Sequence, residues 1–366
     1  MVNLRPFKNL YKNKKVLITG HTGFKGSWLT LWLTMLGANV AGFSNKKKTT
    51  PSLFNVLGLK NKITSFEGDV SNLSEISKAI SKFKPEIIFH LAAQALVKES
   101  YNKPLNTFKS NAIGTLNLLL ASKKSKKLKA IIMITSDKVY KNIEIKRGYK
   151  EDDILMGNDP YSASKSCAEI IINMYLKSYL NIKKNKICVC RAGNVIGGGD
   201  WSSDRIMPDI FKQWAKSKKL IIRNPNSTRP WQFVLEPLGA YLYLGSLLLK
   251  KKNKINFHNF NIGPKKNLDK KVSELVKLAK SELKDLKYVI SKDKTKKEAK
   301  LLKLNCNKIS KLTGWKPIYN FNETVKNTIS WYQNYYMKKE NNLNFSIKQI
   351  DKYVLTAKKK RAIWIK

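Results

Sequence analysis

The sequence lacks long apolar runs, and it has few cysteines and few acidic residues. No stretch of about eighteen uncharged apolar residues occurs, so we expect no membrane-spanning helix. The opening segment MVNLRPFKNLYKNKK has no apolar core of the kind that a secretory signal carries. The four cysteines, Cys167, Cys188, Cys190 and Cys306, form neither a CxxC pair nor a disulfide framework. We therefore expect a cytoplasmic protein without a metal site, in which Cys188 and Cys190 pack in the core.

Acidic residues are scarce relative to basic ones. There are 25 Asp and Glu against 71 Lys and Arg, which gives a formal net charge of +46. Such an excess raises the possibility of a nucleic-acid or anionic-membrane partner. However, only seven of the basic residues are arginine, they are spread along the chain, and no zinc-finger or RNP-type motif accompanies them. We expect no specific nucleic-acid partner and no membrane insertion, and we expect the charge to attract anionic ligands.

The first half of the chain alternates short apolar strands with helices, which is typical of a parallel sheet covered on both faces. Strands are predicted at 14–20, 38–44, 63–70, 85–93, 129–136, 186–192 and 257–264. Helices are predicted at 27–36, 73–83, 104–124, 161–180, 270–285 and 323–337. The pattern predicts an α/β fold with a doubly wound, Rossmann-type sheet and a smaller interleaved α+β lobe. The sheet domain covers 1–192 and returns at 230–264; the small lobe covers 193–229 and 265–340. A basic tail, 341–366, is expected to be loosely held.

A glycine loop joins the first predicted strand to the first helix. Gly20, Gly23 and Gly26 recur at intervals of three in GHTGFKG. The first glycine permits a tight turn, the second lets the backbone approach a pyrophosphate, and the third lets the helix pack close to the strand. The helix N-terminus then faces the anion. This context predicts a dinucleotide site.

The end of the second strand leaves the choice of dinucleotide open. An acidic residue often stands there to hold the adenosine ribose, but this chain has Ser44 and Asn45, followed by three lysines at 46–48. Ser44 and Asn45 could bond the ribose of NAD, whereas the lysines could hold the 2′-phosphate of NADP.

Three further polar residues lie near predicted strand ends. Asp69 could reach the adenine edge, or it could simply cap a turn. His90 precedes the small-residue turn LAAQ (91–94) and is expected to belong to the core. His21 lies inside the glycine loop, and we expect it to order that loop.

Tyr161 and Lys165 are four residues apart at a predicted helix start, so they share one face. A lysine cation beside a phenol lowers the pKa of the phenol, which makes the tyrosine a usable base for a substrate hydroxyl. Ser136 follows the fifth strand at the carboxyl edge of the sheet, where such folds bind ligands. The three residues predict a hydride-transfer site.

These motifs resemble the extended short-chain dehydrogenase/reductase superfamily, and within it the CDP-glucose 4,6-dehydratase family. The motifs that carry the likeness are GHTGFKGSWLTLWL (20–33), TSDKVY (135–140), DPYSASKSCAE (159–169), RAGNVIGGGDW (191–201) and RPWQFVLEPL (229–238). The resemblance implies an NAD-dependent lyase that acts on CDP-glucose in dideoxysugar and polysaccharide biosynthesis, as a homodimer. The implied cofactor contacts are Gly20, Thr22, Gly23, Phe24, Lys25, Gly26, Ser44, Asp69, Val70, Leu91, Ala92, Ala93, Tyr161 and Lys165. The implied substrate contacts are Ser136, Asn194, Arg205 and Arg229.

The reaction that the resemblance implies needs two proton carriers besides Tyr161. The related dehydratases of dTDP-glucose have Asp-Glu where this chain has Asp137-Lys138. Asp137 is then the acid for the departing 6-hydroxyl, provided that its pKa is raised in a closed site. Lys138 would be the base at C5 if neutral, or would stabilise the enolate if charged.

Some features remain open at this stage. Trp201 and Trp231 could stack on a base or pack in the core. Relatives usually have His where this chain has Phe233, so no role is assigned to that position. Two rival functions remain: a 4-epimerase or dehydratase of another nucleotide sugar, and a non-catalytic NAD-binding protein that binds polyanions.

Overall fold

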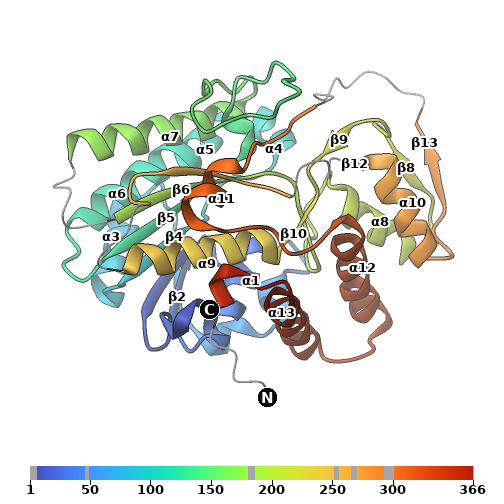
Figure 1. The fold of residues 1–366 in the computed structure, drawn as a ribbon, viewed down its shortest axis with the longest axis horizontal. Helices are drawn as coiled ribbons and strands as arrows, with labels where there is room; N and C mark the ends of the chain where they lie inside the picture. The colour runs from blue at the N-terminus through green and yellow to red at the C-terminus, as the bar shows by residue number, and fades with distance from the viewer. Residues whose placement is uncertain are drawn as a thin grey trace.

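A seven-stranded parallel sheet forms the centre of the larger lobe (Figure 1). The computed structural model describes residues 6–45, 49–179, 186–250, 255–264, 270–291 and 301–365. The strand order is β11-β6-β5-β4-β1-β2-β3, and every neighbouring pair is parallel. The strands are β1 (Lys15–Thr19), β2 (Asn39–Ser44), β3 (Thr64–Glu67), β4 (Ile87–His90), β5 (Ala130–Ile134), β6 (Lys186–Ala192) and β11 (Asn259–Ile262). The order reverses between β1 and β4, so the crevice at their carboxyl ends is where a ligand is expected.

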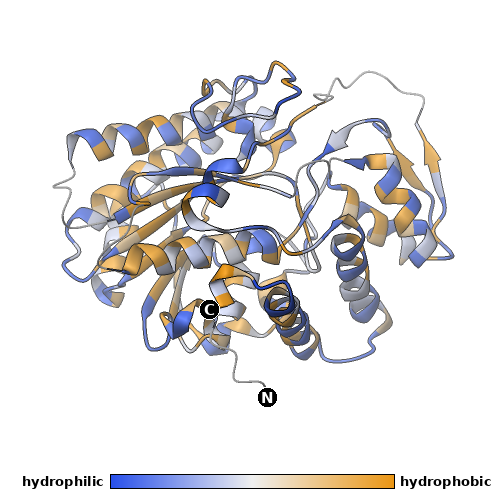
Figure 2. Ribbon diagram, viewed as in Figure 1, coloured by the Kyte–Doolittle hydropathy of each residue, from blue (hydrophilic) through white to orange (hydrophobic). Residues whose placement is uncertain are grey.

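Helices cover both faces of this sheet. One face is covered by α3 (Leu73–Phe83), α6 (Gly114–Lys123) and α7 (Pro160–Ser178), and the other by α1 (Phe24–Met35) and α9 (Leu235–Leu249). Alternate residues of each strand serve the two faces: Ile132 packs with α9, whereas Ile131 and Met133 pack with α3 and α7. The strands are accordingly among the most hydrophobic parts of the ribbon in Figure 2. The continuous apolar strands of the sequence are thus explained by burial on both faces.

The smaller lobe lies to the right in Figure 1 and consists of short two-stranded pieces and helices. Its strands are β7 (Val195–Ile196) with β10 (Gln232–Phe233), β8 (Leu220–Ile222) with β13 (Tyr288–Ile290), and β9 (Thr228–Arg229) with β12 (Lys270–Lys271). Its helices are α8 (Ile206–Trp214), α10 (Val272–Glu282) and α12 (Phe321–Met337). The remaining elements are η1 (Pro6–Asn9), α2 (Leu53–Val56), η2 (Leu59–Lys62), α4 (Val97–Asn102), α5 (Pro104–Phe108), η3 (Lys109–Ile113), η4 (Asp137–Val139), α11 (Asn307–Thr313), α13 (Asn342–Lys359) and η5 (Ile363–Ile365).

The long helix predicted over 104–124 is interrupted by a π-helical stretch. It consists of α5, the π-helical η3 and α6 in succession. Within η3 the Asn111 side chain donates to the Gln94 carbonyl at 3.0 Å and to the Ser164 hydroxyl at 2.8 Å. The irregular turn thereby ties the loop after β4 to α7.

The prediction of a loosely held C-terminal tail is wrong. Residues 342–359 form α13, which packs against α1 and α12. Tyr353 and Trp364 are 0% and 1% exposed, and their rings stack at a centroid distance of 5.9 Å. Between the basic residues of the tail, apolar residues recur at helical spacing. They form one face of α13, and this face packs on the core.

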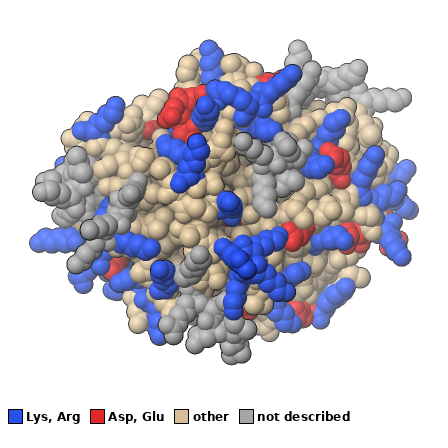
Figure 3. Space-filling model, viewed as in Figure 1, with Lys and Arg blue, Asp and Glu red and all other residues tan. Residues whose placement is uncertain are grey.

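Charge is distributed over the surface. In the face shown in Figure 3, lysine and arginine side chains are scattered over both lobes, with acidic side chains only here and there. Among the described residues, no helix is long and apolar enough to cross a membrane, and no three potential metal ligands cluster.

Candidate active site

The glycine loop is packed so closely that two of its glycines have no room for a side chain. Gly20 has a φ of +75°, and a Cβ there would lie 2.8 Å from the Ala92 backbone nitrogen. A Cβ on Gly26 would overlap the Gly20 carbonyl oxygen. Gly20 therefore permits the turn and the approach of the loop after β4, and Gly26 lets α1 pack against β1.

Helix α1 begins at this loop without a side-chain cap. Gly23 stands at its N-cap position in extended conformation and is exposed, and within the described part of the chain no side chain forms a cap hydrogen bond there. The N-terminus of a twelve-residue helix at the carboxyl edge of a parallel sheet can bind a phosphate group through these N–H groups and the helix dipole.

The other predicted cofactor residues line the same edge of the sheet. The Ser44 hydroxyl at the end of β2 lies 2.9 Å from the Thr22 hydroxyl. Asn45 is exposed beside it, and the three lysines at 46–48 lie outside the described residues. Leu91, Ala92 and Ala93 follow β4 and are half-buried; the Ala92 N–H donates to the Thr19 hydroxyl at 3.2 Å.

Asp69 and Val70 follow β3. The Asp69 carboxylate accepts the Ser71 N–H at 2.8 Å and so forms a turn, which fits the capping alternative without occupying both carboxylate oxygens. Val70 is buried, and its Cγ2 lies against Gly114 of α6, where a Cβ would come within 2.6 Å. Val70 thus also has a packing role.

Both histidines near the cofactor edge are structural. His90 Nδ1 lies 2.7 Å from the Thr19 hydroxyl, and burial together with the nearby Lys165 lowers the pKa of His90 to about 3. His21 is fully buried, and its Nε2 lies 2.9 Å from the Ser65 hydroxyl. The burial of His90 confirms its placement in the core, whereas the ordering of the glycine loop by His21 stays a prediction.

Asp137 and Lys138 belong to the short helix η4 after the carboxyl end of β5, and Ser136 is its N-cap residue. The Ser136 hydroxyl donates to Asp137 Oδ1 at 3.1 Å and accepts the Lys138 N–H at 3.2 Å. Asp137 is 3% exposed, and its Oδ2 has no hydrogen-bond partner among the described residues. Burial raises the pKa of Asp137 against the opposing effects of Lys138, Ser136, Arg229 and Lys25. Lys138 is half-buried. A carboxyl group with a raised pKa and an unpaired oxygen is suited to deliver a proton.

Helix α7 places Tyr161 and Lys165 on one face, as predicted. Pro160 is the first helical residue, and the Asp159 carboxylate caps the helix by accepting the Tyr161 and Ser162 N–H groups at 3.0 Å each. Both Tyr161 and Lys165 are buried. The Lys165 ammonium lies 3.5 Å from the carbonyl oxygen of Ile134, the last residue of β5.

The expected lowering of the Tyr161 pKa is not found. Burial raises the pKa of Tyr161, although hydrogen bonding to Ser136 and the charge of Arg205 oppose the rise. Burial also lowers the pKa of Lys165 to about 8, helped by the charge of Lys25. Desolvation of the phenol is the largest cause of the rise, and the charges of Asp137 and Asp159 act in the same direction.

Lys25, which was predicted only as a cofactor contact, also borders the cleft. Its half-buried side chain lines the same cleft as Asp137 and Tyr161. Burial and the charge of Arg205 lower the pKa of Lys25 to about 8, whereas Asp137 and Cys190 act in the opposite direction. The sequence places Lys25 beside the cofactor, but its approach to Asp137 depends on how β5 and α1 sit in the sheet.

The cleft between the lobes has a volume of about 1390 Å³. The predicted substrate contacts Ser136, Asn194, Arg205 and Arg229 all line it, together with Phe24 and Trp231. Arg205 is paired with the buried Asp200 at 2.9 Å, and Arg229 donates to the Thr228 carbonyl at 2.9 Å. The structure thus brings a carboxyl group, a phenol and cationic side chains from segments far apart in the sequence into one cleft.

The two tryptophans differ in their surroundings. Trp201 packs against Trp331 and Tyr335 in an aromatic cluster, at centroid distances of 5.7 and 4.9 Å. Trp231 is also buried, but it borders the cleft, and its indole N–H donates to the Lys270 carbonyl at 2.9 Å. Trp201 is therefore a core residue. Phe233 is fully buried against Tyr319 and does not border the cleft.

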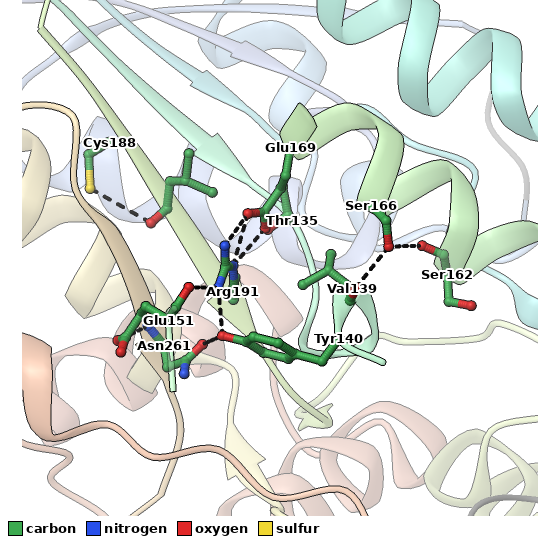
Figure 4. Close-up of polar contacts among 11 residues, drawn as sticks. Thr135, Val139, Tyr140, Glu151, Ser162, Ser166, Glu169, Cys188, Arg191 and Asn261 are labelled. Carbon is green, nitrogen blue, oxygen red and sulfur yellow. Dashed lines mark hydrogen bonds and ion pairs between the residues drawn. The ribbon is translucent and has the colours of Figure 1, made fainter. Parts of the chain in front are cut away.

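A buried ion pair behind the site was not anticipated. Glu169 of α7 and Arg191 of β6 contact each other with side-chain exposures of 2% and 1% (Figure 4). One signal was available in the sequence, because Glu169 continues the four-residue spacing of Tyr161 and Lys165. Its partner on another element could not be read from spacing.

Comparison with known proteins identifies the family and the fold of this chain. A family model described as GDP-mannose 4,6 dehydratase matches residues 17–328. The CDP-glucose 4,6-dehydratase of Salmonella typhimurium is 40% identical over 353 residues, which cover 95% of this chain and 98% of the relative. Two solved structures share the fold at 23% identity. The UDP-glucose 4-epimerase of Thermotoga maritima with UDP-glucose has a TM-score of 0.74 (88% of this chain, 99% of the other). The dTDP-glucose 4,6-dehydratase of Bacillus anthracis in complex with NAD has a TM-score of 0.72 (87% and 96%).

Proposed function

Because this chain belongs to the GDP-mannose 4,6 dehydratase family, we propose that it is an NAD-dependent 4,6-dehydratase of CDP-D-glucose. The product is CDP-4-dehydro-6-deoxy-D-glucose, and one water is lost. The substrate choice is supported by the Salmonella typhimurium relative, to which almost the whole chain aligns. The observation that carries the dehydratase assignment is the buried Asp137 carboxyl, whose Oδ2 is unpaired in the cleft that Tyr161 shares. A 4-epimerase moves no water and needs no such acid.

The glycine loop fits a dinucleotide. Because Gly20 and Gly26 have no Cβ atoms, β1, α1 and the loop after β4 can approach one another closely. The N-terminus of α1 would hold the pyrophosphate through its backbone N–H groups. Ser44 and Asp69 would contact the adenosine, and Leu91, Ala92 and Ala93 of the loop after β4 would contact the cofactor further along. NAD is the cofactor of the Bacillus anthracis neighbour, and when bound here it would accept a hydride from C4 and return it to C6.

Tyr161, Ser136 and Lys165 handle the proton of the 4-hydroxyl. The Tyr161 phenolate takes that proton as the 4-hydroxyl is oxidised to a ketone. The Ser136 hydroxyl orients the phenolate through a hydrogen bond. Burial and the charge of Asp137 raise the pKa of Tyr161, so the cationic form of Lys165 is needed to stabilise the phenolate. The two groups lie one helical turn apart on α7, which keeps this pairing in place.

Asp137 and Lys138 handle the elimination. Once C4 is a ketone, the C5–H proton is acidic because its removal gives an enolate. Asp137 gives its proton to the C6 oxygen, the C–O bond breaks, and water leaves. Lys138 acts at C5, either by taking the proton as a neutral amine or by stabilising the enolate as a cation. Reprotonation of C5 completes the reaction without net oxidation.

Arg205, Arg229 and Asn194 hold the pyrophosphate of the substrate. All three border the cleft on the side of the smaller lobe. The Arg205 guanidinium is already oriented by Asp200, so less side-chain entropy is lost when it binds a phosphate. The charge of Arg229 also reaches Asp137, which links the bound pyrophosphate to the proposed acid.

The protein is proposed to act as a homodimer. Large apolar side chains are exposed on adjacent helices: Leu105 of α5 at 65%, Ile113 of η3 at 44%, and Ile170 and Met174 of α7 at 57% and 39%. In a dimer with two-fold symmetry, an axis through this surface would bury these residues against the same residues of the second copy. Light scattering of wild type and of Ile170→Glu tests this arrangement, because the variant should be monomeric.

The four free cysteines support a cytoplasmic location.

One assay tests the proposed function. Purified protein with NAD is incubated in parallel with CDP-, dTDP-, UDP- and GDP-glucose, and the products are identified by mass. We expect loss of one water from CDP-glucose and little change in the others. A product of unchanged mass with inverted C4 would identify an epimerase, and water loss from another sugar nucleotide would correct the substrate.

A further inference from the structure

Helix α7 carries a third buried polar side chain in line with Tyr161 and Lys165. Glu169 lies four residues beyond Lys165, so the three side chains share one face of the helix. Glu169 does not border the cleft; instead it faces β6. It is therefore placed to hold α7 against the sheet at the level of the proposed catalytic residues.

Its partner is Arg191, the penultimate residue of β6. The Arg191 Nε donates to Glu169 Oε1 and Oε2 at 2.8 and 2.9 Å, and an Nη2 contact to Oε2 completes a forked pair. The other branch, Nη1, donates to the Tyr140 hydroxyl at 2.7 Å and to the Glu151 carbonyl at 2.9 Å. Figure 4 shows Arg191 between α7 and the segment that carries Tyr140.

The segment 135–140 is held to α7 at both ends. At its start, the Thr135 hydroxyl donates to Glu169 Oε1 at 2.6 Å. Towards its end, the Val139 carbonyl accepts the Ser166 hydroxyl at 2.8 Å, and the Tyr140 hydroxyl, bound by Arg191, donates to Asn261 at 2.6 Å. Between these fixed points lie the three residues with proposed roles at the sugar, Ser136, Asp137 and Lys138.

We propose that Glu169 and Arg191 are positioning residues that fix the segment 136–138 relative to Tyr161 and Lys165. This inference rests on the proposed function, because it assumes that both sets act on one sugar. Tyr161 must serve C4 while Asp137 serves C6, so the distance between α7 and the end of β5 decides whether one bound sugar meets both. A displacement of about 1 Å can reduce a rate about a hundredfold.

Stability alone gives little reason to bury this pair. Desolvation of two charges offsets much of their attraction, and an apolar pair of the same volume often stabilises a protein as well or better. The forked geometry, in contrast, defines both distance and angle between α7 and β6. The charge of Glu169 also acts on the site itself, since it opposes the lowering of the Lys165 pKa by burial and Lys25.

Two isosteric variants test the proposal. Glu169→Gln keeps the shape but removes the charge, and Thr135→Val keeps the ion pair but removes one tie. With CDP-glucose as substrate, both should lower kcat about tenfold or more, with KM within about threefold. Glu169→Gln should also move the limb of the pH profile that Lys165 sets to lower pH, whereas Thr135→Val should leave that limb in place.

Glu236→Gln is the matched control. Glu236 is an equally buried carboxylate that binds the Ile318 and Tyr319 N–H groups and does not line the cleft. Its variant should lose stability but keep kcat. The proposal is overturned if Glu169→Gln and Thr135→Val fold and retain kcat, or if Glu236→Gln lowers kcat equally.

A second readout does not depend on the substrate. Amide hydrogen exchange of residues 135–140 should accelerate in Glu169→Gln and Thr135→Val and stay unchanged in Glu236→Gln. If wild type dehydrates no nucleotide sugar, the proposed function fails, while the exchange measurement still decides whether the ion pair holds the segment. Unchanged exchange in both variants would refute the positioning role.

Discussion

The Oδ2 atom of Asp137 lies only 3.0 Å from the point that a Cβ on Gly193 would occupy. The lack of a side chain at Gly193 therefore leaves room beside this carboxylate oxygen, and Cγ of Pro230 lies 3.1 Å from the same point. Gly193→Ala should push the carboxyl group aside and lower the rate of water loss about tenfold, while the fold persists. Circular dichroism and single-turnover water loss from CDP-glucose check this. A variant that eliminates water at the wild-type rate would show that the position of Oδ2 is not critical.

Asp137→Asn removes the proposed proton donor without changing its shape. Water loss should fall by a factor of about 10² to 10⁴, the usual contribution of general acid catalysis. The redox step at C4 should continue, so reduced nicotinamide should accumulate on addition of CDP-glucose, as followed by its absorbance. Normal water loss in this variant would assign the acid to another residue.

Tyr161→Phe removes the hydroxyl that takes the 4-hydroxyl proton. Both nicotinamide reduction and water loss should fall together by a factor of about 10² to 10⁴, because elimination requires the ketone. This joint loss distinguishes Tyr161 from Asp137. Near-normal turnover of CDP-glucose by Tyr161→Phe would contradict the redox assignment.

Lys138 can be tested by exchange of the C5 hydrogen with solvent. In Lys138→Met, a base at this position would be missing, so deuterium should no longer enter C5. If Lys138 instead stabilises the enolate as a cation, exchange should persist at a reduced rate, and Lys138→Arg should restore it. Exchange at the wild-type rate in Lys138→Met would remove Lys138 from the elimination step.

The buried carboxyl of Glu236 predicts a pH-dependent stability. Burial raises the pKa of Glu236 to about 7, against hydrogen bonds from Tyr319, Ile318 and Tyr353. Between its unfolded pKa of 4.5 and about 7 the folded state binds more protons, so this group lowers the free energy of unfolding as pH rises. The decrease is about 3 kcal/mol at most. Urea unfolding across this pH range should show a smaller decline in the free energy of unfolding, or a rise, for Glu236→Gln than for wild type. Identical dependence on pH in the two proteins would contradict the raised pKa of Glu236.

Several parts of the fold and site follow from local patterns. The strands β5 and β6 end where their apolar runs end, and α7 carries Tyr161 and Lys165 on one face because a helix brings residues four apart together. The glycine loop was predictable because strand, turn and helix are adjacent in the chain. The tail was misjudged because its many lysines hide the apolar spacing of α13.

The sequence by itself determined which residue types stand at the ends of β1, β4, β5 and β6, and parallel pairing necessarily brings those ends to one edge. Only the tertiary structure decided how strongly each group is desolvated, and so that the Tyr161 pKa rises instead of falling. Only the tertiary structure brought Lys25 within range of Asp137 and joined Glu169 to Arg191, 22 residues apart. Burial and pairing of this kind depend on the distances between separate elements, and no local spacing encodes those distances.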